Sequence, residues 1–432
     1  MQPAQRRSCS RVGRFVLSLA VAVLVGAGHA HAQAPDASTA DGEWPQFMGP
    51  QRNGISSETG LLVTWPAGGP RVSWRVSGGV GMSGIAVRAG RAVTLVQREG
   101  RQWLVGLDAN NGQTLWQADL APAYQNAMGN GPRATPCIAG GKVFALTGEG
   151  VLAAVDLRDG RRLWSVATLK ELGGQEAEYG MASSPLVAGN VVIVTVGAER
   201  GTVAAFDVGS GQLRWTAGQG PAGYSSPVLR RFAAGQQVVA FCGRAALGLD
   251  PTRGTVLWQY PFDTNYDCNI ALPIEIQGRI FLSAGEDHGS ALLDVRPAGD
   301  GFEVQPVWES LGSDSVLRSE WQTPLYADGY LYGMDNVGGA GPITHLTCID
   351  AATGERKWQQ ARFGKGNLIA ADGKLFLTTM KGELIVARMS SERYEELGRM
   401  TVLGSTRQAP ALAGRRLYVR DERDIVCIDV AR

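Results

Sequence analysis

Three features of the sequence predict an all-β protein, an eight-bladed β-propeller with four-stranded antiparallel blades. One spacing of Asp, Gly and Trp recurs along the chain, glycine makes up 58 of 432 residues, and one copy of the repeat is split between the two ends of the chain. Abundant glycine without a Gly-X-Y period indicates many tight turns, as in all-β repeat proteins. A β-sandwich or two stacked barrels is the alternative, but a fixed period of this length favours a propeller.

The repeated spacing predicts a hairpin. An apolar run ends at each Asp, which is able to form an Asx turn; Gly follows four residues later and supplies the positive φ that a short hairpin loop needs; Trp follows eight residues after the Asp. Each copy is therefore expected to be a hairpin tip whose second strand carries a large aromatic side chain. The five copies are Asp108, Gly112 and Trp116; Asp156, Gly160 and Trp164; Asp207, Gly211 and Trp215; Asp250, Gly254 and Trp258; and Asp350, Gly354 and Trp358.

Three weaker copies bring the number of repeats to eight. Residues 294–308 keep the frame from Asp to Trp with six inserted residues, and residues 383–388 keep only the strand. The last copy reaches Asp429 and stops there, whereas residues 71–75 form an unmatched strand around Trp74. The ring is therefore expected to close by pairing the N-terminal strand near Trp74 with the last blade near Asp429.

The first residues follow the pattern of an export signal. Four arginines precede an apolar run over residues 15–28, and a small-x-small site follows at Ala30 to Ala32. Residues 1–32 are therefore expected to be a signal peptide cleaved after Ala32, which predicts a periplasmic or secreted protein. Residues 33–70 are expected to form a linker, over residues 33–43, and an N-terminal extension, in which residues 44–65 either cross the outer edge of the propeller or plug one end. Residues 71–432 are expected to form the propeller.

Composition excludes several function classes. Removal of residues 1–32 leaves 37 basic and 40 acidic side chains, a net charge of −3, which argues against a nucleic-acid partner. No later segment has the length and hydropathy of a membrane-spanning helix. The five remaining cysteines lie far apart, so neither a disulfide framework nor a zinc site is expected. Only His288 and His345 remain as histidines, neither in a metal-binding spacing, and no metal site is predicted.

The repeat also carries a family resemblance. Residues 350–358 and the other copies resemble the tryptophan-docking motif of the pyrroloquinoline-quinone-like propellers, over roughly residues 70–432. The resemblance implies eight blades, with each Trp packed between neighbouring blades. Three branches are similar to this chain: the quinoprotein alcohol dehydrogenases, the non-enzymatic propeller lipoprotein of the outer-membrane assembly machinery, and exported bacterial propellers of unassigned activity that open with a pattern like residues 44–50.

The candidate ligand site is the ring of loops just before the innermost strands, because these loops line the mouth of a propeller's central channel. They are more polar and more individual than the strands. The predicted ligand-binding residues are Arg133, Tyr179, Ser183, Tyr224, Ser225, Asp267, Asn269, Glu320, Trp321, Lys365 and Arg407.

Residue types that a quinone dehydrogenase needs are present in these loops. They are cations for the carboxylates of the quinone, an aromatic to stack on, and hard oxygens for Ca²⁺. The cations are Arg133, Lys365 and Arg407, the aromatic is Trp321, and the oxygen ligands are Glu320, Asp267 and Asn269. Against the enzyme, the chain has no adjacent Cys-Cys pair, is shorter than the dehydrogenases, and has short loops that exclude water poorly.

The leading prediction is an exported, non-enzymatic propeller without catalytic residues or a cofactor. It would serve as a scaffold that binds an envelope protein or a small ligand, since propellers present broad rigid faces. Two alternatives stay open. One is a short quinoprotein alcohol dehydrogenase that uses pyrroloquinoline quinone and Ca²⁺, and the other is a carbohydrate- or peptide-binding module.

Overall fold

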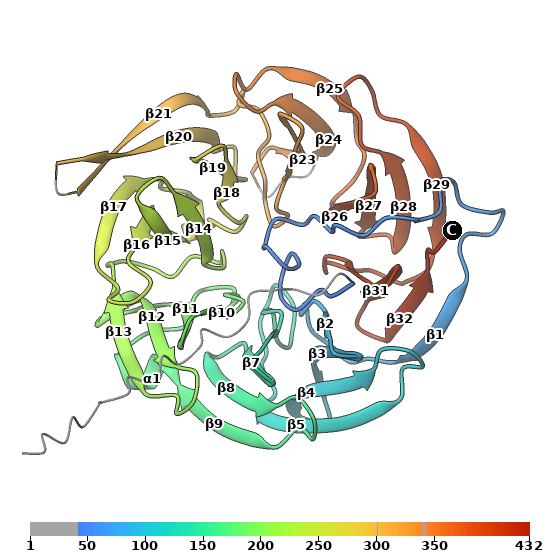
Figure 1. Ribbon diagram of the computed structural model, residues 1–432, viewed down its shortest axis with the longest axis horizontal. Coiled ribbons are helices and arrows are strands. Elements are labelled where there is room, and N and C mark those ends of the chain that lie inside the picture. The colour runs from blue at the N-terminus through green and yellow to red at the C-terminus, as the bar shows by residue number, and fades with distance from the viewer. Residues whose placement is uncertain (1–41, 300, 340–342) are drawn as a thin grey trace, which may run out of the picture. The chain divides into compact units, whose positions relative to one another are not determined.

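A computed structural model describes residues 42–299, 301–339 and 343–432, and the expected signal peptide lies outside them. The described residues form eight four-stranded antiparallel sheets arranged around a common axis (Figure 1). The prediction of an all-β, eight-bladed propeller is therefore confirmed. No helix in the described part of the chain has the length and apolar character needed to cross a membrane.

Seven blades are built from consecutive strands, which follow in chain order from the innermost strand outward. Blade 1 contains β2 (Ala86–Arg88), β3 (Arg91–Arg98), β4 (Arg101–Asp108) and β5 (Thr114–Pro122), and blade 2 contains β6 (Cys137–Ala139), β7 (Lys142–Leu146), β8 (Val151–Asp156) and β9 (Arg162–Ala167). Blade 3 contains β10 (Leu186–Ala188), β11 (Val191–Ala198), β12 (Gly201–Asp207) and β13 (Leu213–Ala217), and blade 4 contains β14 (Val228–Phe232), β15 (Gly235–Cys242), β16 (Ala245–Leu249) and β17 (Val256–Pro261). Blade 5 contains β18 (Ile274–Ile276), β19 (Arg279–Ala284), β20 (Gly289–Ala298) and β21 (Gly301–Leu311). Blade 6 contains β22 (Leu325–Ala327), β23 (Tyr330–Val337), β24 (Ile343–Asp350) and β25 (Arg356–Gln360), and blade 7 contains β26 (Gly366–Ala371), β27 (Lys374–Thr379), β28 (Glu383–Arg388) and β29 (Glu396–Thr401). Two short helical turns, α1 (Thr168–Leu172) and η1 (Asn265–Asp267), lie in links between blades.

Blade 8 closes the ring with strands from both ends of the chain. It contains β30 (Ala411–Ala413), β31 (Arg416–Arg420), β32 (Asp424–Asp429) and, as its outermost strand, β1 (Val72–Ser77). In this pair Trp74 lies opposite Cys427, and Ser77 lies opposite Asp424. The closure predicted from the unmatched strand at Trp74 and the unfinished repeat at Asp429 is confirmed.

The order of the strands gives the ring two different faces. Because neighbouring strands are antiparallel, hairpin tips alternate between the faces. The tips that join first to second and third to fourth strands lie on one face, which we call the plug face. The tips that join second to third strands, and the links between blades, lie on the other, which we call the mouth face. The Asp-Gly-Trp turns join third to fourth strands and therefore all lie on the plug face.

The turns have the geometry that the spacing predicts. In the first copy, an Asp108 side-chain oxygen accepts the Asn110 amide at 2.7 Å, which is an Asx turn. The motif glycines have φ between 73° and 76°, a left-handed conformation that costs other residues free energy. The turn is therefore fixed by an Asp that satisfies its backbone donors and a Gly that tolerates its φ. These glycines are Gly112, Gly160, Gly211, Gly254 and Gly354.

Most blades are fastened to the next by the tryptophan that follows this turn. The indole N–H of Trp74 donates to the Ala109 carbonyl of blade 1 at 3.1 Å, and that of Trp116 donates to the Leu157 carbonyl of blade 2 at 3.0 Å. The same bond to the next blade recurs at Trp164 with the Val208 carbonyl, Trp215 with the Pro251 carbonyl, Trp308 with the Ala351 carbonyl and Trp358 with the Ser390 carbonyl.

The motif glycines also have a packing role. A Cβ added to Gly112 would come within 2.7 Å of the Trp74 ring, because the bare Cα leaves room for the indole of the preceding blade. The other four motif glycines repeat this contact: Gly160 with Trp116, Gly211 with Trp164, Gly254 with Trp215 and Gly354 with Trp308. The Gly of each motif is therefore selected both by the φ of its turn and by the ring that lies on it.

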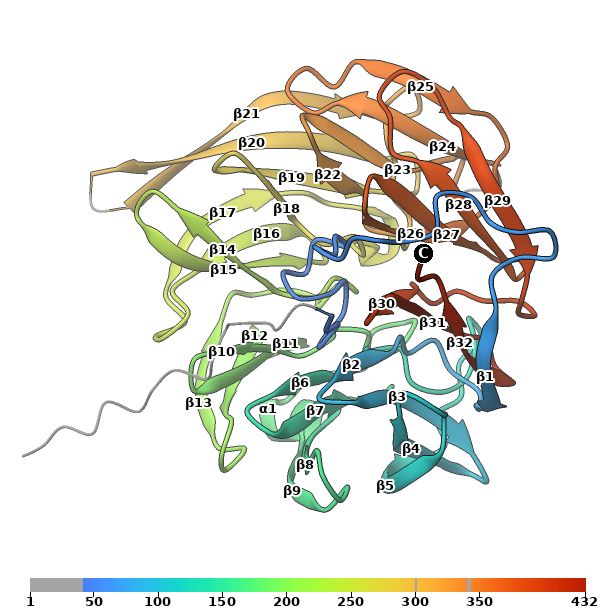
Figure 2. The same cartoon turned by 45° about the vertical axis from the view of Figure 1, so that its right-hand side comes forward.

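Blade 5 departs from this pattern, since its inserted residues extend the hairpin β20–β21. This hairpin projects beyond the rest of the ring (Figures 1 and 2). The preceding tryptophan, Trp258, donates instead to the Gln237 side chain of its own blade at 2.7 Å.

The N-terminal extension closes the plug face. It bridges from Trp44 to Val87 of blade 1, and from Ile55 to Ala370 of blade 7. It lies over the centre of the ring before it runs outward to β1 (Figure 1). Trp44 is only 2% exposed, so the segment is part of the core. Residues 44–62 thus plug the end of the channel, and the residues just after them pass along the outer edge at blade 7.

Candidate functional site

A cavity of about 620 Å³ opens on the mouth face, at the axis of the ring. Its wall takes at least one residue from every blade: Gly84, Thr135, Ser184, Ser226, Ile270, Trp321, Asn367 and Ala409. Phe47 of the plug also lines it, so the channel ends blindly. The volume lies within the range of ordinary ligand pockets.

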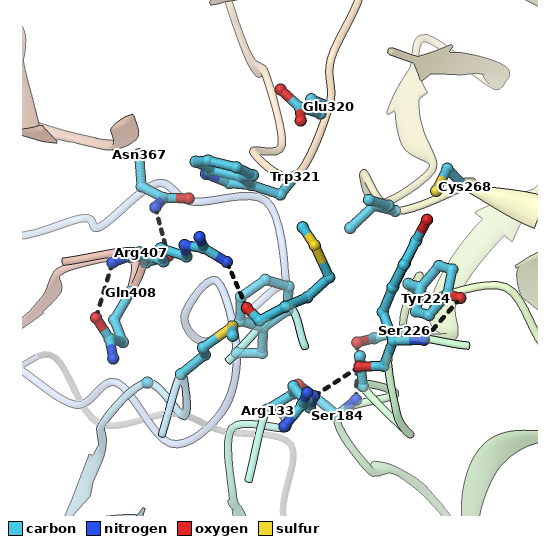
Figure 3. Close-up of a pocket in the computed structure, with 18 of the residues that line it drawn as sticks. Arg133, Ser184, Tyr224, Ser226, Cys268, Glu320, Trp321, Asn367, Arg407 and Gln408 are labelled. Atoms are coloured by element: carbon cyan, nitrogen blue, oxygen red, sulfur yellow. Dashed lines mark hydrogen bonds between the residues drawn. The ribbon is translucent and has the colours of Figure 1, made fainter. Parts of the chain in front are cut away.

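The cavity brings together six of the eleven predicted ligand-binding residues. They are Arg133, Tyr179, Tyr224, Glu320, Trp321 and Arg407, and Figure 3 shows most of them around the opening. The phenol rings of Tyr179 and Tyr224 stack with their centroids 5.5 Å apart. These residues come from several different links between blades, which is why they lie far apart in the sequence.

Arg133 is bound to the protein's own backbone. Its Nε donates to the Tyr179 carbonyl at 2.7 Å, one terminal nitrogen donates to the Gly129 carbonyl at 2.7 Å, and the other donates to the Gly131 carbonyl. The guanidinium also lies 4.6 Å from the centroid of the Tyr124 ring. Burial lowers the pKa of Arg133. Its main role is therefore to shape the loop that it ties together.

A second cationic group surrounds Trp321. Lys365 Nζ and Glu320 Oε2 lie 2.6 Å apart, and the same ammonium lies 4.8 Å from the centroid of the Trp321 ring. Arg407 lies 5.5 Å from that centroid and donates to the Met128 carbonyl at 2.8 Å. Burial raises the pKa of Glu320, which the bond to Lys365 partly offsets. Lys365 thus acts through its contacts with Glu320 and Trp321 and is not part of the cavity wall.

Ser183 and Ser225 do not line the cavity, and their prediction as wall residues is corrected. Both are at most 1% exposed; Ser183 accepts the Thr195 amide at 3.0 Å, and Ser225 donates to the Ala271 carbonyl at 2.8 Å. Side chains alternate in extended chain, so the neighbouring residues Ser184 and Ser226 face the cavity instead. The sequence showed the two Ser pairs but not which member of each pair points inward.

The serines and threonines of the wall form a belt between blades. The Gly84 amide donates to Thr135 Oγ1 at 3.1 Å, the Thr135 amide donates to Ser184 Oγ at 3.0 Å, and the Ser184 amide donates to Ser226 Oγ at 2.8 Å. Each hydroxyl therefore satisfies a buried amide of the preceding blade. Most polar groups of the wall are in this way already engaged within the protein.

Asp267 and Asn269 also lie away from the cavity. Asn269 is fully buried, and its amide donates to the carbonyls of Cys242 and Phe262 at 2.8 Å each. Asp267 pairs with Arg244 at 3.3 Å and lines a second, smaller hollow of about 220 Å³. Asn269 is therefore a structural residue that holds the link between blades 4 and 5.

The structure adds wall residues that the sequence did not indicate. Met82, Met128 and Tyr266 contribute apolar surface, and Tyr266 is 60% exposed. Cys268 also lines the cavity, and burial raises the pKa of its thiol to about 12, so the thiol is neutral. The available signal was the presence of large apolar residues in loops that would otherwise be polar.

These residues do not fit a quinone bound with Ca²⁺. The three proposed oxygen ligands are engaged separately, Glu320 by Lys365, Asp267 by Arg244, and Asn269 by backbone carbonyls. Over the described ranges, no group of three or more His, Cys, Asp or Glu side chains could hold a metal ion. The donors of Arg133 are bound to carbonyls and are not open to the carboxylates of a quinone.

Comparisons with known proteins point to two kinds of relative. A family model described as outer membrane protein assembly factor BamB matches residues 65–174 and 100–360. The BamB protein of Yersinia pestis is 21% identical over 258 residues, which is 59% of this chain and 63% of that protein. Quinohemoprotein alcohol dehydrogenase ADH IIB of Pseudomonas putida is 32% identical over 124 residues, 26% of this chain and 17% of that protein. The matches thus span less than two thirds of either relative.

A solved structure shares the fold. The quinohemoprotein alcohol dehydrogenase of Comamonas testosteroni superposes with a TM-score of 0.65, covering 90% of this chain and 80% of that one. The two sequences are 14% identical, so the likeness concerns the fold alone.

Proposed function

Because the chain belongs to the family described as outer membrane protein assembly factor BamB, we propose that it is an exported, non-enzymatic binding protein of the cell envelope. Its relatives of that name assist the assembly of outer membrane proteins. In this proposal the mouth face is the binding surface, and a segment of a partner protein enters the cavity. The proposal assigns no cofactor and no catalytic residue.

One observation carries the proposal, namely that the cavity offers shape and apolar surface rather than reactive groups. The N–H groups of Arg133 donate hydrogen bonds to backbone carbonyls, and the wall hydroxyls accept hydrogen bonds from backbone amides. The Cys268 thiol is neutral. Met128 and Tyr266 are among the few large apolar residues that are strongly exposed, and both line the opening. Methionine and tyrosine are suited to binding, because Met adapts to different shapes and Tyr combines an apolar ring with a polar tip.

Site-specific photocross-linking in the envelope tests the proposal. A photoreactive phenylalanine analogue at Met128 should cross-link to a defined envelope protein, to be identified by mass spectrometry. The same analogue at Glu355, which is 71% exposed on the plug face, should not capture that protein. Absence of any envelope protein from the Met128 cross-link would contradict the proposal.

The enzyme alternative needs its own assay. The protein without residues 1–32 would be mixed with pyrroloquinoline quinone and Ca²⁺, and dye-linked oxidation of alcohols would be measured. We expect no turnover, and clear turnover would replace the binding function with a dehydrogenase. N-terminal sequencing of the protein recovered from the envelope fraction should begin at Gln33, which tests export and cleavage after Ala32.

A further inference from the structure

The mouth continues sideways into the smaller hollow beside blades 3 and 4. The hollow of about 220 Å³ shares Tyr224 and Tyr266 with the main cavity, so the two form one elongated depression. Glu176 and Glu178 line the hollow, and both are exposed or partly exposed. An elongated depression with two compartments suits an extended chain better than a compact small molecule.

The two compartments differ in charge. Among the described residues neither Glu176 nor Glu178 takes part in an ion pair, whereas Asp267 in the same hollow pairs with Arg244. On the other side of the cavity, Arg407 donates to the backbone carbonyl of Met128 at 2.8 Å. The hollow is therefore the negative end of the depression, and the wall near Arg407 is the positive end.

The backbone between the compartments is held in an unusual conformation. Tyr266 and Asp267 have φ of 59° and 53°, a left-handed region that costs non-glycine residues about 1 kcal/mol each. This conformation presents the Tyr266 side chain, 60% exposed, at the junction of cavity and hollow. Strain of this kind persists where the surrounding structure enforces it, and it is commonly found at binding sites.

From this arrangement we propose that the mouth binds an extended peptide segment with a large apolar side chain in the cavity and a neighbouring Lys or Arg in the hollow. The inference rests on the proposed binding function and names the chemistry of the segment. The aliphatic stem of the basic residue packs along the rings of Tyr224 and Tyr266, and its charged end reaches Glu176 and Glu178. Arg407 disfavours a second basic residue at the far end.

Calorimetric titration of the protein with three capped pentapeptides tests the proposal. The peptides share a Ser background and carry a central Phe with Lys two residues away, Phe with Glu, or Ala with Lys. At low salt the Phe/Lys peptide should bind about five- to tenfold more tightly than the Phe/Glu peptide, because its Lys forms ion pairs with the two glutamates. The difference stays in this range because each exposed ion pair contributes only a small part of the binding free energy. The Ala/Lys peptide should bind at least about tenfold more weakly than the Phe/Lys peptide, because the cavity stays empty.

Matched variants assign the effect to the hollow. In Glu176→Gln/Glu178→Gln the preference for Lys over Glu should fall below about twofold, whereas Glu355→Gln on the plug face should leave it unchanged. Both variants change side chains outside the core, so their melting temperatures should equal that of the parent protein.

Equal affinity for the Lys and Glu peptides, or no binding of any peptide, overturns the inference. If the Met128 cross-link still captures an envelope protein in that case, the binding function stands and only the chemistry of the segment is wrong. If that cross-link also fails, both proposals fall.

Discussion

The indole of Trp65 lies on Gly398, at the place where other blades carry their own tryptophan. Gly398 of β29 pairs with Val386 beside a β-bulge, as Trp358 pairs with Cys348 in blade 6. A Cβ added to Gly398 would come within 2.7 Å of Trp65 Cβ. Trp65 also packs against the core cluster that contains Leu412 and Val386. The N-terminal extension therefore supplies the aromatic side chain that the seventh repeat has lost.

Replacing this borrowed aromatic should weaken the ring. Trp65→Ala is expected to reduce the free energy of unfolding by about 2 kcal/mol, since the side chain is partly buried and the change leaves a gap over β29. Chemical denaturation measures the loss. Val63→Ala, at a residue that is 42% exposed two positions earlier, is the control and should change stability by less than about 0.5 kcal/mol. Equal effects of the two variants would show that Trp65 has no special role.

The motif glycines should be more sensitive to substitution than their φ alone predicts. Gly112 has φ of 76° and contacts Trp74, whereas Gly141 has φ of 72° and nothing within 4 Å of an added Cβ. Gly141→Ala should cost about 1 kcal/mol through backbone strain. Gly112→Ala should cost about 3 kcal/mol, because the indole must also move. Thermal unfolding of the two variants compares them directly, and similar melting temperatures would contradict a packing role for Gly112.

Arg52 should hold the plug in the channel. It is 1% exposed, and it donates to the carbonyls of Ser184 at 3.1 Å and Pro227 at 2.8 Å, on blades 3 and 4. Burial lowers the pKa of its guanidinium to about 10, so the charge persists at neutral pH. Arg52→Met should cost about 3 kcal/mol, because buried carbonyls lose their donors.

Limited proteolysis followed by mass spectrometry checks the role of Arg52. Cleavage between residues 53 and 60 should become faster in Arg52→Met than in the parent protein. The control is Arg71→Met, whose side chain is 76% exposed in its pair with Asp429. An unchanged cleavage rate in Arg52→Met would mean that other contacts hold the plug.

His288 should make stability depend on pH. Its ring lies 4.3 Å from that of Phe262, and burial lowers its pKa below the ordinary value in the folded protein. As the pH falls below about 6.5, the unfolded chain takes up the proton before the folded protein does. The contribution of neutral His288 to the free energy of unfolding is therefore complete above that pH and is lost on acidification. Between pH 7.5 and 5.5 the melting temperature should fall less in His288→Gln than in the parent protein, and equal falls would exclude this contribution.

The repeat made most of the fold predictable, because its information is local. The Asp forms an Asx turn with the residues next to it, and the Gly is needed for the φ of the same turn. The closure of the ring could also be predicted, since an unmatched strand at Trp74 and an unfinished repeat at Asp429 complete one another. The role of Trp65, which replaces the missing tryptophan of blade 7, could not be predicted from the sequence. No local pattern marks residue 65 as a neighbour of Gly398.

The candidate site was less predictable, because orientation and partnership depend on the whole ring. The sequence identified the right loops, but Ser183 and Ser225 point away from the cavity while Ser184 and Ser226 point into it. Asn269 was expected to meet a ligand and instead binds backbone carbonyls. Residue type shows which groups are able to bind, whereas the structure shows which of them are already engaged.

The sequence by itself determined the number of blades, their strands and turns, and the closure of the ring. Each of these depends on residues within one repeat or on the two ends of the chain. The tertiary structure decided the rest. It placed Phe47 at the floor of the channel, engaged Arg133 and the wall hydroxyls within the protein, and joined Tyr224 and Tyr266 in one elongated depression. The physical reason is that the cavity is lined by one or a few residues from each of eight blades, and no spacing along the chain specifies contacts between side chains so far apart in sequence.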